Sequence, residues 1–354
     1  MDYYSRKDGL NYEFQLRWNE WNAPDGTKSK QFPDRSDGLL EQYYLFEKYM
    51  NEKKHPNVNL GAAISGSGLL TDHGVEHVKS VINHALDIIS DVNDLTGYEI
   101  YILLMAIHFH DLGNVFGRDD HEQRIADIID EMGDRLPLDN PEKEYVAAIA
   151  TAHGGYVDGD KDTISYINLD EVYSGIRIRP RLLAAILRFA DEISDDLKRA
   201  GNGVDVPEGN KVFHEYSKAL APISVVSQTL RLHFRIPYNL TQDKIGKGDT
   251  KVFLYDEIKE RLAKCMRELE YCRKYSDGLI KVTTLDVAID YLKKDSNTRK
   301  LESDAFRLSL HGYPDKKIFS LEHYLDNSGT VGETRTLKYK DGEELCVEMK
   351  KWGD

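Results

Sequence analysis

The chain has 354 residues, 40% of them hydrophobic and 31% charged, a composition typical of a globular protein with one large domain or two ordinary ones. Its formal net charge is −14, and because binding to a nucleic-acid backbone usually needs a basic surface, long DNA or RNA is not expected as a partner. A small anionic substrate is compatible with this charge if metal ions and a few local Arg or Lys residues supply positive charge.

The ends and the cysteines of the chain bear on its location. The N-terminal residues lack the basic-then-apolar shape of a signal peptide, and no apolar run is long enough to span a bilayer. Cys265, Cys272 and Cys346 match no zinc or disulfide spacing, which suits a reducing compartment. We therefore predict a cytoplasmic protein without a membrane partner, and we leave its oligomeric state open.

Residues 1–67 are predicted to form an N-terminal helical appendage. Residues 39–50 carry an apolar stripe at helical spacing, and residues 23–37 before them form a turn-rich loop. The Ser-Gly-Ser-Gly run at residues 65–68 is predicted to be a flexible linker. It lacks the Lys-Ser/Thr ending of a phosphate-binding P-loop.

Residues 68–200 show helical periodicity throughout and are predicted to form a second domain. Residues 101–111 are so apolar that they predict a helix buried on most sides, ending in adjacent His110 and Asp111. Further helices are predicted near residues 78–89 and 120–132, from Asn140-Pro141 as N-cap and first position, and from Pro180. The polar segment 157–179 could be a lid or an insertion over a site.

Residues 201–354 have a different texture and are predicted to form an α+β region. Residues 229–237 alternate apolar and polar side chains as a strand does, and residues 279–289 indicate another strand. Residues 252–275 predict a long amphipathic helix, and residues 336–347 predict a terminal hairpin that turns at Asp341-Gly342. The expected fold is thus mainly α, a helical bundle core with a smaller α+β C-terminal region.

Six polar side chains recur on or beside the inner faces of the predicted helices of residues 68–200. They are His77, His110, Asp111, His121, His153 and Asp191. Polar groups that point into a core must converge on something that satisfies them, and any one of these histidines alone would be read as a hydrogen-bonded core residue. For the six together we predict a shared metal site, since divalent ions take mixtures of imidazole and carboxylate.

At this point the sequence resembles a known family. His77, the doublet His110-Asp111 and the pair Ala190-Asp191 resemble the signature of HD-domain phosphohydrolases, over about residues 71–198. With His121 and His153, the order H…HD…H…H…D is similar to the six-ligand, two-metal branch, which includes cyclic-nucleotide and cyclic-dinucleotide phosphodiesterases. Residues 114–121 depart from the run found in many dNTP triphosphohydrolases. The whole chain is most similar to stand-alone HD proteins of bacterial conflict and stress systems.

This resemblance implies an HD-type bundle that holds one or two divalent ions. One ion would be bound by His77, His110, Asp111 and Asp191, and the second by Asp111, His121 and His153. The implied reaction is hydrolysis of a phosphoester or phosphoanhydride bond of a small nucleotide, such as a nucleoside triphosphate or a nucleotide second messenger, by a metal-activated bridging water. A single-ion site remains open if His121 or His153 points away. Manganese is one candidate metal among Mn, Fe, Co, Ni, Zn and Mg.

Other residues near the motifs are candidates for catalysis and substrate binding. Arg118, Arg188 and Lys79 could contact substrate phosphates, and Arg118, beside His121, is the best placed; the alternative for each is an ordinary ion pair. With Asp111 and Arg118, His73 is a catalytic candidate, as a base or a leaving-group acid, unless it merely caps its helix. Glu122 is expected to face solvent. Three tyrosines in or directly before segment 157–179 could either stack on a nucleotide base or anchor the loop. They are Tyr156, Tyr166 and Tyr173.

Two other function classes stay open at this level. Some HD proteins use mixed-valent iron to oxidise rather than hydrolyse, and the six-ligand set is compatible with such an oxygenase. A nucleotide sensor without turnover is the other alternative, although binding alone requires no bridging water.

Overall fold

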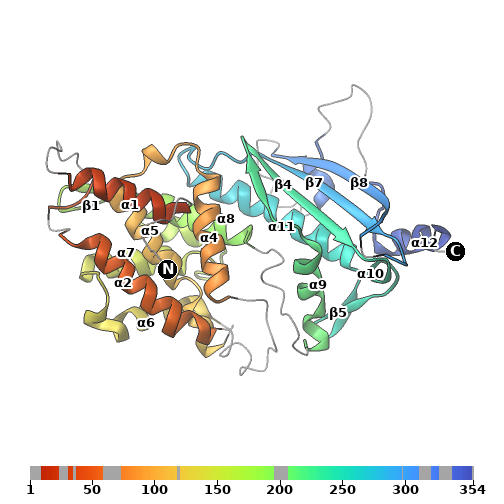
Figure 1. Cartoon of the computed structure of the whole chain (residues 1–354), viewed down its shortest axis with the longest axis horizontal. Helices are drawn as coiled ribbons and strands as arrows, with labels where there is room; N and C mark the ends of the chain where they lie inside the picture. Colours follow the sequence, from red (N-terminus) through yellow and green to blue (C-terminus); the bar gives the residue numbers. More distant parts are fainter. Residues whose placement is uncertain are drawn as a thin grey trace. The chain divides into compact units, whose positions relative to one another are not determined.

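The computed structural model describes residues 9–23, 31–34, 37–58, 73–117, 120–194, 206–296, 298–310, 320–326 and 337–352. The chain divides into two compact units, coloured along the sequence in Figure 1. The N-terminal unit consists of the described residues within Met1–Ser67, His73–Ser194 and Cys272–Ile280. The C-terminal unit consists of the described residues within Asp195–Tyr271 and Lys281–Asp354.

The N-terminal unit is built from helices and one small hairpin. Its α-helices are α1 (Gly9–Trp21), α2 (Leu39–Tyr49), α4 (Val75–Ile88), α5 (Gly97–Phe109), α6 (Ile125–Met132), α7 (Asn140–Thr151) and α8 (Pro180–Glu192). A π-helix, η2 (Met50–Lys54), continues α2, and short 3₁₀ helices η4 (Leu112–Phe116), η5 (His121–Arg124) and η7 (Thr163–Tyr166) lie between the others. The hairpin pairs β1 (Glu171–Tyr173) with β2 (Ile176–Ile178).

Helix α5 lies at the centre of this unit. All of its residues are buried, and it contacts α1, α4, α7 and α8. Thr96 and Glu99 start the helix with a reciprocal capping box, in which each side chain accepts from the other residue's backbone N–H. The prediction of a helix buried on most sides is confirmed. Its last turn therefore delivers His110 and Asp111 into the interior of the unit.

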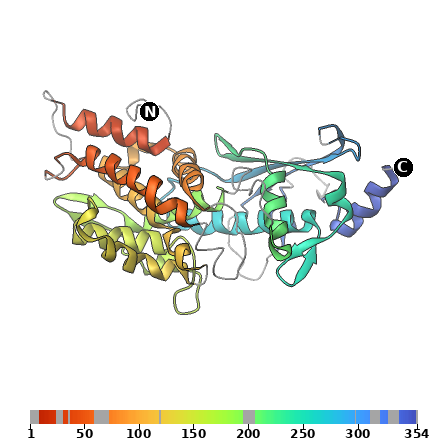
Figure 2. The same cartoon turned by 60° about the horizontal axis from the view of Figure 1, so that its bottom comes forward.

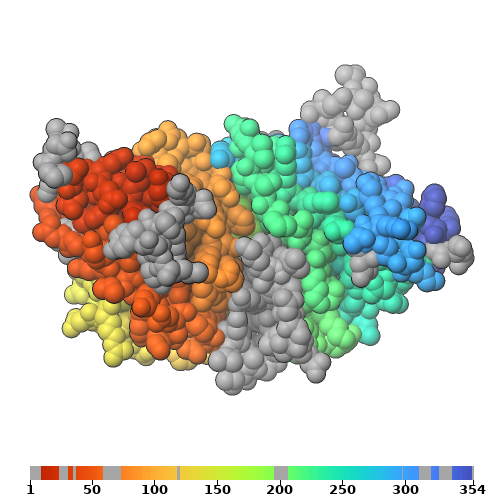
Figure 3. Space-filling model, in the orientation of Figure 1, coloured from red at the N-terminus to blue at the C-terminus, as the bar shows by residue number. Residues whose placement is uncertain are grey.

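The N-terminal helices α1 and α2 complete the core around α5. Phe14 of α1 packs between Tyr43 of α2 and Tyr101 of α5, with ring centroids 5.3 and 5.7 Å away. Both views of the ribbon show α1 and α2 side by side over the other helices of the unit (Figure 2). In the space-filling view their side chains, in red, continue into the orange surface of α4 (Figure 3).

A buried chain of hydrogen bonds joins these elements. Asn11 donates to Glu47 at 3.1 Å and accepts from the Tyr43 hydroxyl at 2.6 Å. The same hydroxyl lies 3.3 Å from His108 Nε2, and His108 Nδ1 lies 3.1 Å from Nε2 of His55. Because His55 is only 1% exposed, burial comes first among the causes that lower its pKa to about 3, followed by the nearby His110 and His77.

We expect His55 to make the protein acid-sensitive. Its folded pKa lies below the unfolded value, so the unfolded chain binds a proton first, and stability is lost as the pH falls below about 6.5. Between pH 7 and pH 5 the free energy of unfolding of the wild type should fall by about 2 kcal/mol more than that of His55→Gln. Urea unfolding at both pH values measures this difference. Parallel losses in the two proteins would contradict it.

The C-terminal unit contains a four-stranded sheet. Its strands are β3 (Ser224–Val226), β4 (Thr229–Ile236), β7 (Thr284–Leu292) and β8 (Lys300–Ser309), in the order β3-β4-β7-β8. The β4–β7 pair is parallel and the other two pairs are antiparallel. The helices are α9 (Lys211–Ala219), α10 (Tyr238–Gln242), α11 (Leu254–Lys274) and α12 (Gly342–Trp352). The last turn of α11 belongs to the N-terminal unit. A small hairpin pairs β5 (Ile245–Lys247) with β6 (Thr250–Val252).

The two faces of this sheet differ. Burial alternates along β4, so that Leu230, Leu232, Phe234 and Ile236 are buried and the residues between them are exposed. Helix α11 lies behind one face of the sheet (Figure 1). The opposite face carries the polar residues of the central strands, as the period of two along a strand requires.

The predicted fold class is confirmed: the chain is mainly α with an α+β C-terminal region. The predicted terminal hairpin is wrong, because Asp341 directly precedes helix α12 instead of forming a hairpin turn. Its side chain accepts from the Glu344 N–H at 2.9 Å, and Glu344 accepts from the Lys340 N–H, which is the arrangement that starts a helix.

Two helix starts also differ from the prediction. Helix α7 is capped by Asp139 rather than by Asn140, with Glu142 completing its capping box. The predicted helix 120–132 begins with the 3₁₀ turn η5 before α6. In the described part of the chain, no single helix has both the length and the apolar character needed to cross a membrane.

Candidate metal centre

The end of α5 sets the geometry of the centre. His110 is the C-cap of α5, and Asp111 leaves the helix with φ −104° and ψ 1°. The ring Nδ1 of His110 lies 2.7 Å from the carbonyl oxygen of Ile107. Because a carbonyl can only accept, Nδ1 carries the hydrogen, and Nε2 is the nitrogen that the neutral ring presents to the interior of the unit.

Three side chains gather around Nε2 of His77, which α4 contributes. This nitrogen lies 3.2 Å from His110 Nε2, 3.3 Å from Asp111 Oδ2 and 3.1 Å from Oδ1 of Asp191, near the end of α8. His77 is 1% exposed and His110 is fully buried. Among the described residues, His77 Nδ1 is buried without a hydrogen-bond partner, so the polar contacts of this ring converge on Nε2.

A second set of donors lies on the other side of Asp111. The Nε2 atoms of His121 and His153 lie 3.5 and 3.7 Å from Asp111 Oδ1. His153 follows α7, and its Nδ1 lies 2.6 Å from the carbonyl oxygen of Ala150, which presents Nε2 to the centre as in His110. The two oxygens of Asp111 thus face different groups of ligands, Oδ2 toward His77 and His110 and Oδ1 toward His121 and His153.

The charges of the buried groups favour a cation. Burial opposes ionisation of Asp111 and Asp191, but the neighbouring histidines outweigh it and hold the pKa of both carboxyls well below the usual range. Burial also lowers the pKa of His110, yet the carboxylates of Asp111 and Asp191 outweigh it and raise that pKa to about 10, so a divalent ion would displace a proton from Nε2 to reach the neutral ring. Burial keeps His153 neutral, with its pKa lowered to about 4. Ionised carboxylates among imidazoles form a set of donors suited to a divalent ion.

The structure brings all six predicted ligands together. One potential ligand atom from each of His77, His110, Asp111 and Asp191 lies within 4.8 Å of the others, and the same holds for Asp111, His121 and His153. Each of these two groups, which share Asp111, could therefore hold a divalent ion. Neither His121 nor His153 points away from this carboxylate, the arrangement that would have left a single-ion site.

Two supporting residues were missed by sequence reasoning. Glu122 was expected to face solvent, but it is 9% exposed, and its Oε2 lies 3.4 Å from Nδ1 of His121. It packs under the turn after α7, where a Cβ added to Gly154 would lie 2.7 Å from Glu122 Oε1. Asn114 donates to Asp111 Oδ1 at 3.0 Å. The position of Asn114 three residues after Asp111 could have indicated this contact from the sequence. The direction of the Glu122 side chain could not be predicted in the same way, because η5 is a 3₁₀ helix rather than an α-helix.

We expect Glu122→Ala to weaken metal binding without unfolding the protein. A carboxylate on the far nitrogen of a ligand histidine fixes the orientation of the ring, and removing such a group costs about 10- to 100-fold in metal affinity. Titration of the metal-free protein with Mn²⁺ or Co²⁺ measures the change. Glu131→Ala, an exposed carboxylate on the neighbouring helix α6, is the matched control and should bind as the wild type does.

The remaining candidates are placed as follows. His73 is buried, with its ring centroid 5.7 Å from that of His77. Arg188 is also buried and donates to the Lys161 carbonyl oxygen and the Thr163 hydroxyl at 3.2 and 2.9 Å. Lys79 forms an exposed ion pair with Glu76 at 2.6 Å. The remaining residue, Arg118, lies outside the described residues.

The segment predicted as a lid or an insertion contains η7 and the β1–β2 hairpin. Tyr156 and Tyr166 are more than half exposed. Tyr173 instead stacks on Tyr98 at 6.0 Å between ring centroids and donates a hydrogen bond to Asp139. This tyrosine fixes the hairpin to the helical core.

The fold and the cluster define a helical domain with a candidate metal centre. Residues 67–220 match the family model described as HD-CE, and this range contains all six candidate ligand residues. The chain therefore contains an HD-type domain, as its motifs predict. A comparison with curated proteins found no significant match. An HD-type domain with such a cluster suggests metal-dependent hydrolase activity.

Proposed function

We propose that the protein is a divalent-metal-dependent phosphohydrolase that acts in the cytoplasm on a small nucleotide. The substrate would be a nucleoside triphosphate or a nucleotide second messenger. The observation that carries the proposal is the position of Asp111, whose two oxygens face two separate groups of ligands. A pair of bridged ions would supply an activated water and neutralise the charge that develops on the phosphoryl oxygens.

The residues of the chain would contribute orientation and protons. His110 and His153 are fixed by backbone carbonyls, so their Nε2 atoms are held in place before a substrate arrives. His73, buried next to His77, is the proposed proton donor to the leaving group. Arg118 is the first proposed phosphate contact. Arg188 and Lys79 are weaker candidates, since each already has a partner in the structure.

The test is product release from a panel of NTPs, dNTPs, dinucleoside polyphosphates and cyclic nucleotides. Each substrate is incubated with Mn²⁺, Mg²⁺, Co²⁺ or Fe²⁺, and an EDTA-treated sample serves as the control. We expect metal-dependent release of phosphate or of a nucleotide from at least one substrate class. The product separates a triphosphohydrolase from a phosphodiesterase.

Two other outcomes would overturn the proposal. Iron-dependent oxygen uptake without hydrolysis would identify an HD-type oxygenase. Thermal stabilisation by a nucleotide without any turnover would identify a sensor, because a ligand that binds only the folded state raises its stability.

A further inference from the structure

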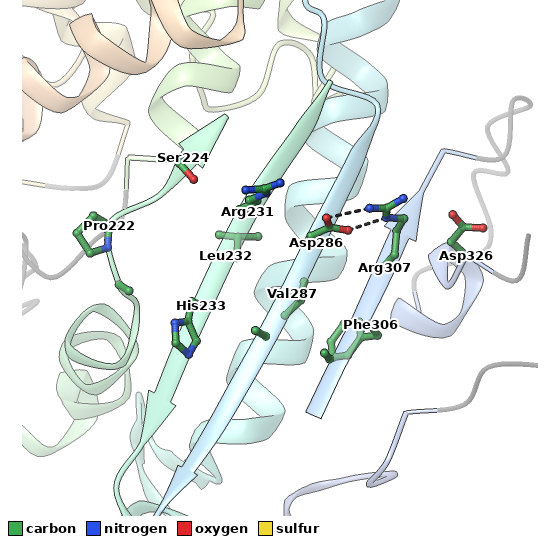
Figure 4. Close-up of a pocket in the computed structure, with 13 residues that line it drawn as sticks. Pro222, Ser224, Arg231, Leu232, His233, Asp286, Val287, Phe306, Arg307 and Asp326 are labelled. Carbon is green, nitrogen blue, oxygen red and sulfur yellow. Dashed lines mark hydrogen bonds and ion pairs between the residues drawn. The ribbon is translucent and has the colours of Figure 1, made fainter. Parts of the chain in front are cut away.

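The C-terminal unit has a pocket on the open face of its sheet, separate from the metal centre. Its volume is about 670 Å³, which is within the usual range for small-ligand sites. Residues of the four strands and two flanking loops line it (Figure 4). Nothing in the proposed hydrolase reaction uses this pocket.

Two alanines lie side by side at the bottom of the pocket, and their short side chains leave space above the sheet. Ala288 of β7 is the register partner of Ala305 of β8, and His233 of β4 is paired with Ala288 on the other side. The neighbouring row on the same face consists of Arg231, Asp286 and Arg307. Long side chains thus stand beside a small, flat depression about two strand spacings wide.

Arg231 is the feature that points to a ligand. It is exposed, and within the described part of the chain it forms no hydrogen bond or ion pair. Its neighbours on this face are already held: Arg307 donates to both oxygens of Asp286 at 2.6 and 2.9 Å, and His233 lies 2.9 Å from Asp290. Asp286 and Asp290 therefore fix the positions of two basic groups and leave the Arg231 guanidinium available.

The charge left unpaired on this face favours an anion. The basic side chains share the face with carboxylates: Asp286 is held by Arg307 and Asp290 by His233, and Asp326 also lines the pocket. In the described part of the chain, Arg231 is the cation of the pocket lining that no carboxylate holds. Guanidinium groups match the geometry of phosphate oxygens, and the exposed Ser224 hydroxyl of β3 adds a donor on the same row as Arg231.

Among the residues that the structure describes, this face lacks the exposed aromatic side chains of a nucleic-acid surface. Single-stranded RNA and DNA bind sheets through exposed aromatic side chains on which bases stack. The aromatic residue that lines this pocket, Phe306, is buried on the helix side of the sheet. A small ligand therefore fits the pocket better than a polynucleotide.

We propose that this pocket binds a small phosphorylated molecule, with its phosphate on Arg231 and Arg307 and its organic part over Ala288 and Ala305. The site is independent of the metal centre and of the hydrolase reaction proposed for it. In this proposal the C-terminal unit binds a ligand that is distinct from the substrate of the metal centre.

The test is isothermal titration calorimetry of the full chain with AMP, inorganic pyrophosphate and citrate, with EDTA present so that the metal centre does not contribute. We expect saturable binding of AMP and pyrophosphate. Arg231→Gln should weaken both by about tenfold or more, since a charge-assisted hydrogen bond is lost. The matched control is Arg235→Gln, two residues further along the same strand and outside the pocket, which should change binding less than about twofold.

Three results would overturn the proposal. One is the absence of saturable binding of AMP and pyrophosphate, and another is equal weakening by Arg231→Gln and Arg235→Gln. The third is a preference for a different ligand class. Tighter binding of citrate than of both phosphates would indicate a carboxylate site, and much tighter binding of a short single-stranded oligouridine than of AMP would indicate a nucleic-acid surface.

Discussion

Asp111→Ala is expected to remove bound metal from both halves of the centre and to lower turnover by about a thousandfold or more. The reason is geometric: Oδ2 of Asp111 lies 3.3 Å from both His77 and His110, and Oδ1 lies within 3.7 Å of His121 and His153. One substitution thus withdraws a ligand from two groups of imidazoles. His110→Ala should lose turnover as well, through the first group alone.

Metal content per chain and the rate of product release measure the effect. Asp127→Ala, an exposed carboxylate on α6, is the matched control and should keep both at the wild-type level. The far-ultraviolet circular dichroism of Asp111→Ala should stay close to that of the wild type, because α5 ends before this residue. Full metal occupancy and full activity in Asp111→Ala would show that the bridging assignment is wrong.

Glu99→Ala is expected to be the most destabilising of the substitutions considered. Glu99 is 1% exposed and accepts from Arg179 through both of its oxygens, at 2.8 Å each. It also accepts from the N–H of Thr96 and completes the cap of α5. The Arg179 side chain is 16% exposed, so its guanidinium would lose a largely desolvated partner, which costs about 3 kcal/mol in free energy of unfolding.

Urea unfolding followed by circular dichroism gives this number. Arg177→Ala is the matched control, since Arg177 lies two residues before Arg179 and pairs with Asp170 at the surface, with side-chain exposures of 61% and 39%. An exposed pair contributes less than about 1 kcal/mol. If Glu99→Ala lost no more stability than Arg177→Ala, the buried pair would not be a main support of α5.

The ligand set could be predicted from the sequence because helical periodicity determines which face of a helix a residue occupies. His77 and His153 lie at the spacing of the buried positions of α4 and α7, so each could be assigned to an inner face without coordinates. His110 and Asp111 follow a run of buried residues, which places them at the end of a core helix. The structure confirms an HD-type domain around these residues.

Residues outside regular helices were predicted less well. Glu122 was assigned to solvent on α-helical geometry, but η5 is a 3₁₀ turn, and its tighter winding turns Glu122 toward His121. Asp341-Gly342 is equally compatible with a hairpin turn and a helix start. The chain forms the helix, where Asp341 accepts from the Glu344 N–H and Glu344 accepts from the Lys340 N–H.

The sequence by itself determined most of the elements, the fold class and which side chains gather at the candidate metal centre, because these depend on local periodicity and composition. Only the tertiary structure decided which oxygen of Asp111 faces which histidine and that His55 is buried against His108. It also decided that Arg231 lies in the same pocket as the neighbouring Ala288 and Ala305. These features depend on contacts between segments distant in the chain, and their geometry follows from packing, which no local pattern encodes.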